Sequence, residues 1–99
     1  MKYKIALVGC GRISFKHIEA YANNTEKLIM TAACDPVIER AQAKADEYIK
    51  SVGTADVAVF DDYKEMLKTA KPDIVTIATE SGKHRGIAID CLNAGCHVI

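Results

Sequence analysis

Gly9-Cys10-Gly11-Arg12-Ile13-Ser14 is the stretch of sequence that decides the fold of this 99-residue chain. An aliphatic, β-branched run over residues 3–9 precedes it, and such a run ended by glycine predicts a buried strand. Apolar residues then recur at helical spacing over residues 15–22, which predicts a helix. The two glycines therefore lie in a tight turn between a strand and a helix.

The same alternation of strand and helix continues to the end of the chain. Further strands are predicted at residues 28–34, 57–60, 73–79 and 97–99, and further helices at residues 36–50, 63–70 and 84–93. Short connections between them predict a doubly wound, parallel α/β sheet of the Rossmann type with strand order 3-2-1-4-5. Ligands of such sheets bind at the carboxyl ends of the strands, beside the point where the order reverses. Residues 9–14 and 79–84 are therefore expected to flank one crevice.

Particular residues are expected to begin and end these helices. Asp35 followed by Pro36 predicts an N-cap and a first helical residue for the second helix. Asp61 or Asp62 is expected to cap the third helix, and Gly95 to close the fourth. The side chains that the fourth helix is expected to bury are Ile87, Ala88, Cys91 and Leu92.

Composition excludes several classes of protein. The chain carries 13 basic and 13 acidic side chains, so no basic stripe is available to bind nucleic acid. Its apolar runs are too short to span a membrane, and its first residues do not resemble a signal peptide. The four cysteines form no Cys-x-x-Cys pair and have no histidine at zinc-finger spacing, so no metal site is expected. We interpret them as buried free thiols in a reducing compartment, the cytoplasm.

The glycine stretch matches the dinucleotide-binding fingerprint Gly-x-Gly-x-x-Gly/Ala, with Ser14 in the third position. The first glycine allows a tight turn, the second lets a diphosphate approach the backbone, and a small third residue keeps the helix close to the sheet. Ser14 is also expected to cap the first helix. The N-terminus of that helix supplies free N–H groups and a positive dipole end for phosphate.

Asp35 ends the second predicted strand about 20 residues after the glycine stretch, where a carboxylate accepts hydrogen bonds from the adenosine ribose. An acid at this position repels the 2′-phosphate of NADP, so NAD is the favoured cofactor. The alternative for Asp35 is a role as N-cap alone. Arg40 is either a contact for a 2′-phosphate or a solvated charge, and Arg12 is either a phosphate contact or a surface residue.

The whole chain resembles the N-terminal part of the Gfo/Idh/MocA oxidoreductases. The resemblance lies in residues 4–13 (KIALVGCGRI), in Cys34-Asp35, in residues 73–79 (DIVTIAT) leading to His84, and in residues 94–99 (AGCHVI), which precede that family's Glu-Lys-Pro signature. It implies an NAD(P)-dependent dehydrogenase that moves a hydride between the nicotinamide and the carbinol carbon of a sugar, cyclitol or sugar nucleotide. The glycine string is similar to that of sugar-nucleotide 3-dehydrogenases.

The resemblance also implies a set of cofactor-binding residues around the crevice. Those on the diphosphate and adenosine ribose side are Gly9, Gly11, Arg12, Ile13 and Asp35. Those on the nicotinamide ribose side are Thr79, Ser81 and His84. The family pattern here is Thr-Pro-Asn-x-x-His, and in this chain Glu80 and Ser81 replace its Pro and Asn. The alternative role for His84 is packing on the sheet.

The chain ends at Ile99, inside an apolar run and without a turn or cap. A natural domain rarely ends within a strand, so we expect a fold truncated in its fifth strand. Residues 1–99 then form one dinucleotide-binding domain. By resemblance, the catalytic lysine and the C-terminal substrate domain, which often builds a homo-oligomer, lie beyond Ile99, and no catalytic residue is assigned within the chain.

Two other functions fit parts of the same pattern. A non-catalytic NAD-binding regulatory module would carry the same glycine loop, although it has no need of a matching motif at Thr79 and His84. A methyltransferase also has a glycine-rich cofactor loop. Its loop commonly follows an acidic residue, however, and here Leu7 and Val8 precede Gly9.

Overall fold

The computed structural model describes residues 2–11, 14–53, 56–79 and 81–99, with the backbone alone at residues 81 and 82. The described residues form one parallel, five-stranded sheet. Its strands are β1 (Tyr3–Val8), β2 (Leu28–Cys34), β3 (Ala58–Phe60), β4 (Ile74–Ile77) and β5 (His97–Val98). They lie in the order β3-β2-β1-β4-β5, so the predicted doubly wound topology is confirmed.

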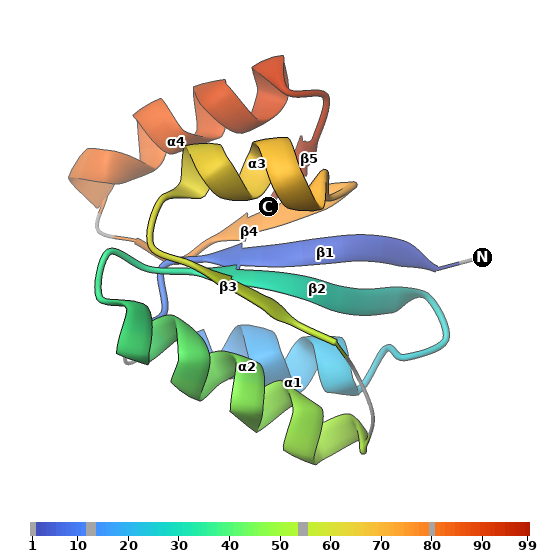
Figure 1. Cartoon of the computed structure of the whole chain (residues 1–99). Helices are drawn as coiled ribbons and strands as arrows, with labels where there is room; N and C mark the ends of the chain where they lie inside the picture. The colour runs from blue at the N-terminus through green and yellow to red at the C-terminus, as the bar shows by residue number, and fades with distance from the viewer. Residues whose placement is uncertain (1, 12–13, 54–55, 80) are drawn as a thin grey trace.

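Helices cover both faces of the sheet. They are α1 (Phe15–Ala22), α2 (Ile38–Val52), α3 (Tyr63–Ala70) and α4 (Ser81–Asn93). Figure 1 shows α1 and α2 on one face and α3 and α4 on the other. This two-sided cover explains why β1 is apolar at successive positions instead of alternating with polar residues.

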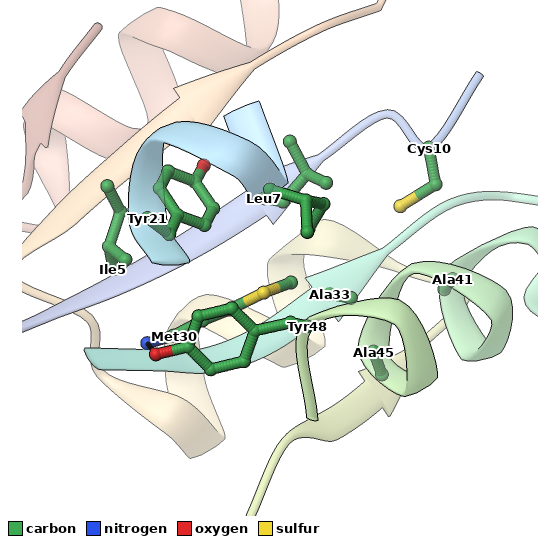
Figure 2. Close-up of a cluster of buried hydrophobic side chains, with 10 residues drawn as sticks. Ile5, Leu7, Cys10, Tyr21, Met30, Ala33, Ala41, Ala45 and Tyr48 are labelled. Carbon is green, nitrogen blue, oxygen red and sulfur yellow. Dashed lines mark hydrogen bonds between the residues drawn. The ribbon is translucent and has the colours of Figure 1, made fainter. Parts of the chain in front are cut away.

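Two hydrophobic cores therefore share the central strand β1. Ile5 and Leu7 point into the core under α1 and α2, while Ala6 and Val8 point into the core under α3 and α4. Figure 2 shows the first of these cores, in which α2 approaches the sheet through two fully buried alanines, Ala41 and Ala45, beside Tyr48 and Met30. Small residues at these positions let the helix lie close to the strands.

The pairing of β1 with β2 contains one irregularity. Ile5 pairs with Met30, but the next residue, Ala6, pairs with Ala32, so Thr31 is an extra residue in β2. The hydroxyl oxygen of Tyr48, on α2, accepts a hydrogen bond from the backbone N–H of Met30 at 3.2 Å. The two residues lie side by side in Figure 2. A helix side chain thus satisfies a buried backbone group beside the irregularity.

Two of the expected helix starts were wrong. The N-cap position of α2 is Val37, and the helix begins at Ile38, because the Asp35 carboxylate accepts a hydrogen bond from the Val37 N–H at 2.8 Å and holds the chain in a turn first. Helix α4 begins at Ser81, three residues before the expected His84. Two other expected caps are confirmed: Asp62 accepts from the Lys64 N–H, and Gly95 has a positive φ of +88°.

The predicted buried face of α4 was correct only in part. Ile87 and Cys91 are buried as expected, but Leu92 is 59% exposed. Ile89, which was not assigned to that face, is 48% exposed. Apolar residues occur on more than one side of this helix, so their spacing does not indicate a single buried face.

Candidate cofactor-binding site

A cleft of about 320 Å³ opens where β1, β2 and β4 end. The residues that line it are Gly9, Gly11, Asp35, Pro36, Val37, Arg40, Ala78, Thr79 and Lys83. They come from the loops after three different strands and from the first turns of α2 and α4. The prediction that the glycine stretch and the segment after β4 flank one crevice is therefore confirmed for Gly9, Gly11 and Thr79.

Gly9 lies where the end of β1 passes directly against the end of β4. Its φ is +91°, a conformation that favours glycine. A Cβ atom added at Gly9 would lie 2.8 Å from both the carbonyl carbon of Ala78 and the backbone nitrogen of Thr79, so no larger residue fits. The backbone N–H of Gly9 donates to the Cys34 carbonyl at 2.8 Å, which fixes the turn against β2 as well.

Gly11 has a different environment. A Cβ atom added there would meet nothing within 4 Å, so the space in front of Gly11 is open. Gly9 is required by the protein's own backbone, whereas Gly11 leaves room for a group from outside. This division of roles is the one expected of the first two glycines in a dinucleotide-binding loop.

Ser14 closes the glycine loop, although its side chain does not cap α1 as expected. It occupies the N-cap position with helical backbone angles and makes no side-chain cap hydrogen bond. Its hydroxyl donates instead to the Gly11 carbonyl at 2.6 Å, and its N–H donates to the same carbonyl at 3.1 Å. Ser14 is fully buried, which agrees with the need for a small residue in the third position.

Asp35 connects the glycine loop to the start of α2 at one end of the cleft. Its carboxylate is 6% exposed, with Oδ2 accepting from the Cys10 N–H and Oδ1 from the Val37 N–H, both at 2.8 Å. Each carboxylate oxygen can accept a further hydrogen bond. Asp35 therefore holds the glycine loop against the start of α2 and keeps acceptor capacity for a ligand.

Not every predicted site residue can be placed in the cleft. Arg12 and Ile13 lie outside the described residues, and the side chain of Ser81 does so too, although its backbone is the first residue of α4. His84 lies half-buried in α4, and the described lining of the cleft does not include it. Their cofactor contacts remain predictions.

The cleft also contains residues that were not assigned as binding residues from the sequence. Val37 and Lys83 line it, and Arg40, considered only as one of two alternatives, lines it as well. Val37 owes its place to the turn that Asp35 forms, which delays the start of α2. Lys83 lies within the segment 79–84 that was expected to flank the crevice, but its place in the first turn of α4 became visible only with the structure.

Cys10, between the two glycines, is a packing residue. Its side chain is 4% exposed, and its thiol donates to the Cys34 carbonyl at 3.4 Å. Burial, together with the negative charge of Asp35, raises the pKa of Cys10 to about 12. The thiol is therefore protonated at neutral pH and is a poor nucleophile.

The four helices differ in the charge of their first turns. Helices α2 and α3 carry an acid in the first turn, Glu39 and Glu65, and a base in the last turn, Lys50 and Lys68. Helices α1 and α4 have no acid in the first turn. Their first turns therefore hold no carboxylate that would compensate the positive end of the helix dipole, and such a helix end favours an anion.

The described part of the chain has neither a membrane-spanning helix nor a metal-binding cluster. None of its helices is both long and apolar enough to cross a membrane. Among the same residues, no group of three or more His, Cys, Asp or Glu side chains is arranged to hold a metal ion.

Comparison with known proteins gives several relatives of the same kind. The chain is 31% identical to D-glucoside 3-dehydrogenase of Escherichia coli over 96 residues, which are 97% of this chain and 26% of that protein. It is 30% identical to inositol 2-dehydrogenase of Salmonella typhimurium over 98 residues, which are 99% of this chain and 28% of that protein. The chain thus spans about a quarter of the length of these relatives.

Solved structures show the same likeness in three dimensions. The WlbA dehydrogenase of Bordetella pertussis, in complex with NADH and UDP-GlcNAcA, superposes with a TM-score of 0.84 at 35% identity over 99% of this chain and 28% of its own. The scyllo-inositol dehydrogenase of Lactobacillus casei, with bound NAD(H) and scyllo-inositol, superposes with a TM-score of 0.77 at 33% identity. That match covers 99% of this chain and 27% of the dehydrogenase.

A family model described as the oxidoreductase family with an NAD-binding Rossmann fold matches residues 3–99. The match includes every element of the sheet and both sides of the cleft. The chain therefore belongs to the Gfo/Idh/MocA oxidoreductase family, and its fold is that family's NAD-binding Rossmann fold.

Proposed function

We propose that this chain binds NAD(H) in the cleft at the switch point and forms the cofactor-binding domain of a dehydrogenase acting on a sugar, cyclitol or sugar nucleotide. The observation that carries the proposal is the pairing of the open backbone at Gly11 with the buried carboxylate of Asp35 across one cleft. The relatives that match the chain include sugar and cyclitol dehydrogenases, and one was crystallised with NADH and a sugar nucleotide.

In this proposal the cofactor's diphosphate lies on the glycine stretch. Gly9 brings β1 against β4, and the open face of Gly11 receives the phosphate oxygens beside the N-terminus of α1. Arg12 and Ile13 complete this contact. Asp35 accepts hydrogen bonds from the adenosine ribose through the acceptor positions that the Cys10 and Val37 N–H groups leave open.

The nicotinamide half extends toward the segment after β4. Thr79, Ser81 and His84 contact the nicotinamide ribose, because they follow the strand on the far side of the switch point. The bound nicotinamide supplies or accepts the hydride. The chain's own residues bind and orient it. The lysine of the Glu-Lys-Pro signature, the other proton-transferring residues and the substrate domain belong to a part of the enzyme outside residues 1–99, as the resemblance to the family implies.

Two properties of the whole protein accompany this proposal. We propose a cytoplasmic location, because the four cysteines are free and buried, as is typical of a reducing compartment. We also propose a homo-oligomer, as the resemblance to the family implies, and a small sugar-type molecule as substrate, with no role for nucleic acid or membrane.

The proposal is tested by titrating the chain with NADH and NADPH and following nicotinamide fluorescence. NADH is expected to bind in the micromolar to millimolar range and more tightly than NADPH, because the Asp35 carboxylate repels a 2′-phosphate. A chain that binds neither cofactor would contradict the proposed function.

Asp35→Ala tests the ribose contact itself. Loss of a charged acceptor is expected to weaken NADH binding by about tenfold or more and NADPH binding less, because the repulsion is lost as well. The substitution also leaves the Cys10 and Val37 N–H groups without their acceptor, so the ratio of the two affinities is compared within each variant. Equal losses for both cofactors would show that Asp35 has a structural role only.

A further inference from the structure

Lys83 is a charged residue in the cleft for which the fold supplies no partner among the described residues. It lies in the first turn of α4, is exposed, and lines the cleft together with Gly9, Gly11 and Thr79. The ion pair found in the described part of the chain joins Lys44 to Glu47 on α2, and Lys83 has none there. No described residue therefore competes with a ligand for its ammonium group through an ion pair.

The position of Lys83 is unfavourable for the protein alone. A lysine in the first turn of a helix meets the positive end of the helix dipole, where an acid is the stabilising choice. Lys64 occupies the same kind of position in α3, but there Glu65 lies in the same turn, whereas the first turn of α4, which holds Lys83, has no acid. Residues that break a local rule without a structural gain are expected at functional sites.

We propose that Lys83 binds a phosphate of the bound dinucleotide from the wall of the cleft opposite the glycine stretch. This proposal rests on the proposed NAD(H)-binding function and adds to it a residue that neither the fingerprint nor the family pattern assigns. The three donors of a lysine ammonium group and its compact charge suit a phosphate oxygen.

The diphosphate is the phosphate that the geometry favours. Gly9 packs directly against Thr79: a Cβ atom added at Gly9 would lie 2.8 Å from the Thr79 backbone nitrogen. Lys83 follows Thr79 by four residues in the sequence. The segment that carries Lys83 is thus the one against which the glycine stretch is packed. Arg40 lines the same cleft from α2, the helix that follows Asp35, and so belongs to the side where the adenosine ribose and any 2′-phosphate are proposed to bind.

The test compares Lys83→Gln with a matched control, Lys64→Gln. Lys64 is also an exposed lysine in the first turn of a helix, α3, but it does not line the cleft. Lys83→Gln is expected to weaken binding of NADH, NADPH and ADP-ribose alike, by about tenfold at low salt, because all three contain the diphosphate. The loss is expected to shrink as salt is added. Lys64→Gln is expected to leave all three affinities unchanged.

Thermal unfolding without ligand supplies a second readout. Both substitutions remove a cation from the positive end of a helix, so each is expected to raise the Tm by roughly 1–5 °C. Only Lys83→Gln is then expected to lose affinity, which separates ligand binding from folding. Lys83→Arg, which retains the charge, is expected to keep most of the affinity.

The outcomes distinguish this proposal from the proposed function. If the unchanged chain binds NADH and Lys83→Gln binds it equally well, the assignment of Lys83 is wrong and the NAD(H) proposal stands. If the unchanged chain does not bind NADH, the proposed function itself is wrong. A loss confined to NADPH would overturn the diphosphate assignment and move the contact to the 2′-phosphate.

Discussion

Gly9 has both a positive φ and a close contact with the backbone after β4, and substitutions can separate the free-energy costs of the two. The positive φ costs a residue with a Cβ atom about 1–2 kcal/mol, and the contact with the Ala78 and Thr79 backbone adds an overpacking cost of about 1–3 kcal/mol. Gly9→Ala is therefore expected to lower the free energy of unfolding by roughly 2–5 kcal/mol, measured by urea denaturation.

Two other glycines provide controls for this prediction. Gly95 has a φ of +88° with nothing within 4 Å of an added Cβ, so Gly95→Ala is expected to show the conformational cost alone. Gly11 has the same open space without a positive φ, so Gly11→Ala is expected to change stability by about 0.5 kcal/mol or less. Equal losses at Gly9 and Gly95 would show that the close approach to β4 is not tight.

At the scale of the helices and strands, Tyr48 shows how a helix stabilises an irregular strand. Its hydroxyl accepts the Met30 N–H, and both residues are buried beside the extra residue in β2. Tyr48→Phe leaves that N–H without a partner and is expected to cost about 1–3 kcal/mol in denaturant unfolding. Tyr3→Phe, at a residue that is 56% exposed, is the matched control and is expected to be neutral. An unchanged stability for Tyr48→Phe would mean that water replaces the hydroxyl.

The strands and their order follow from local sequence, whereas several helix starts do not. Runs such as residues 28–34 are apolar and bounded by turn residues, so β2 was predicted with its correct bounds. The start of α2 depends on the turn in which one oxygen of the Asp35 carboxylate accepts from the Val37 N–H, while the other oxygen accepts from the N–H of Cys10, 25 residues away in the chain. No local pattern reports such a partner, and the N-cap prediction was wrong for that reason.

In the candidate site, too, some residues follow from local sequence and others from tertiary contacts. The glycine stretch and Asp35 could be predicted because each has a fixed spacing within the strand-turn-helix unit. The presence of Val37 and Lys83 in the cleft depends on how three separate segments meet at the end of the sheet. Such a meeting is a property of the tertiary structure, so those two residues appeared only with the fold.

For the whole molecule, the shared strand β1 makes the two cores one cooperative unit. Ile5 and Leu7 belong to one core and Ala6 and Val8 to the other, so opening either face disturbs the same strand. The four free thiols are distributed over both cores. Cys10 lies in the core under α1 and α2, and the other three lie in the core under α3 and α4. A single opening transition should therefore expose all of them.

Thiol labelling tests this cooperativity. In native buffer Ellman's reagent is expected to react slowly with all four cysteines, and in denaturant to react rapidly with all four, with free glutathione as the control for reagent activity. Below the unfolding midpoint, mass spectrometry of alkylated peptides measures the free energy of opening at each cysteine. We expect the same value for Cys10 as for Cys34, Cys91 and Cys96, and we expect it to equal the free energy of global unfolding. A distinct value for Cys10 would show that the two faces of the sheet open independently.

The same thiols make stability depend on pH in a definite direction. Burial raises the pKa of Cys10 and Cys34 from the ordinary value of 9.0 to about 12, and that of Cys91 to about 11. Because the folded-state pKa lies above the unfolded one, this stabilisation is complete below about pH 9 and is lost as the pH rises toward 11–12. Urea midpoints measured from pH 7 to pH 11 should therefore fall on the alkaline side. Cys91→Ala is expected to reduce the decrease of the urea midpoint with rising pH. An unchanged decrease would show that other titrating groups cause it.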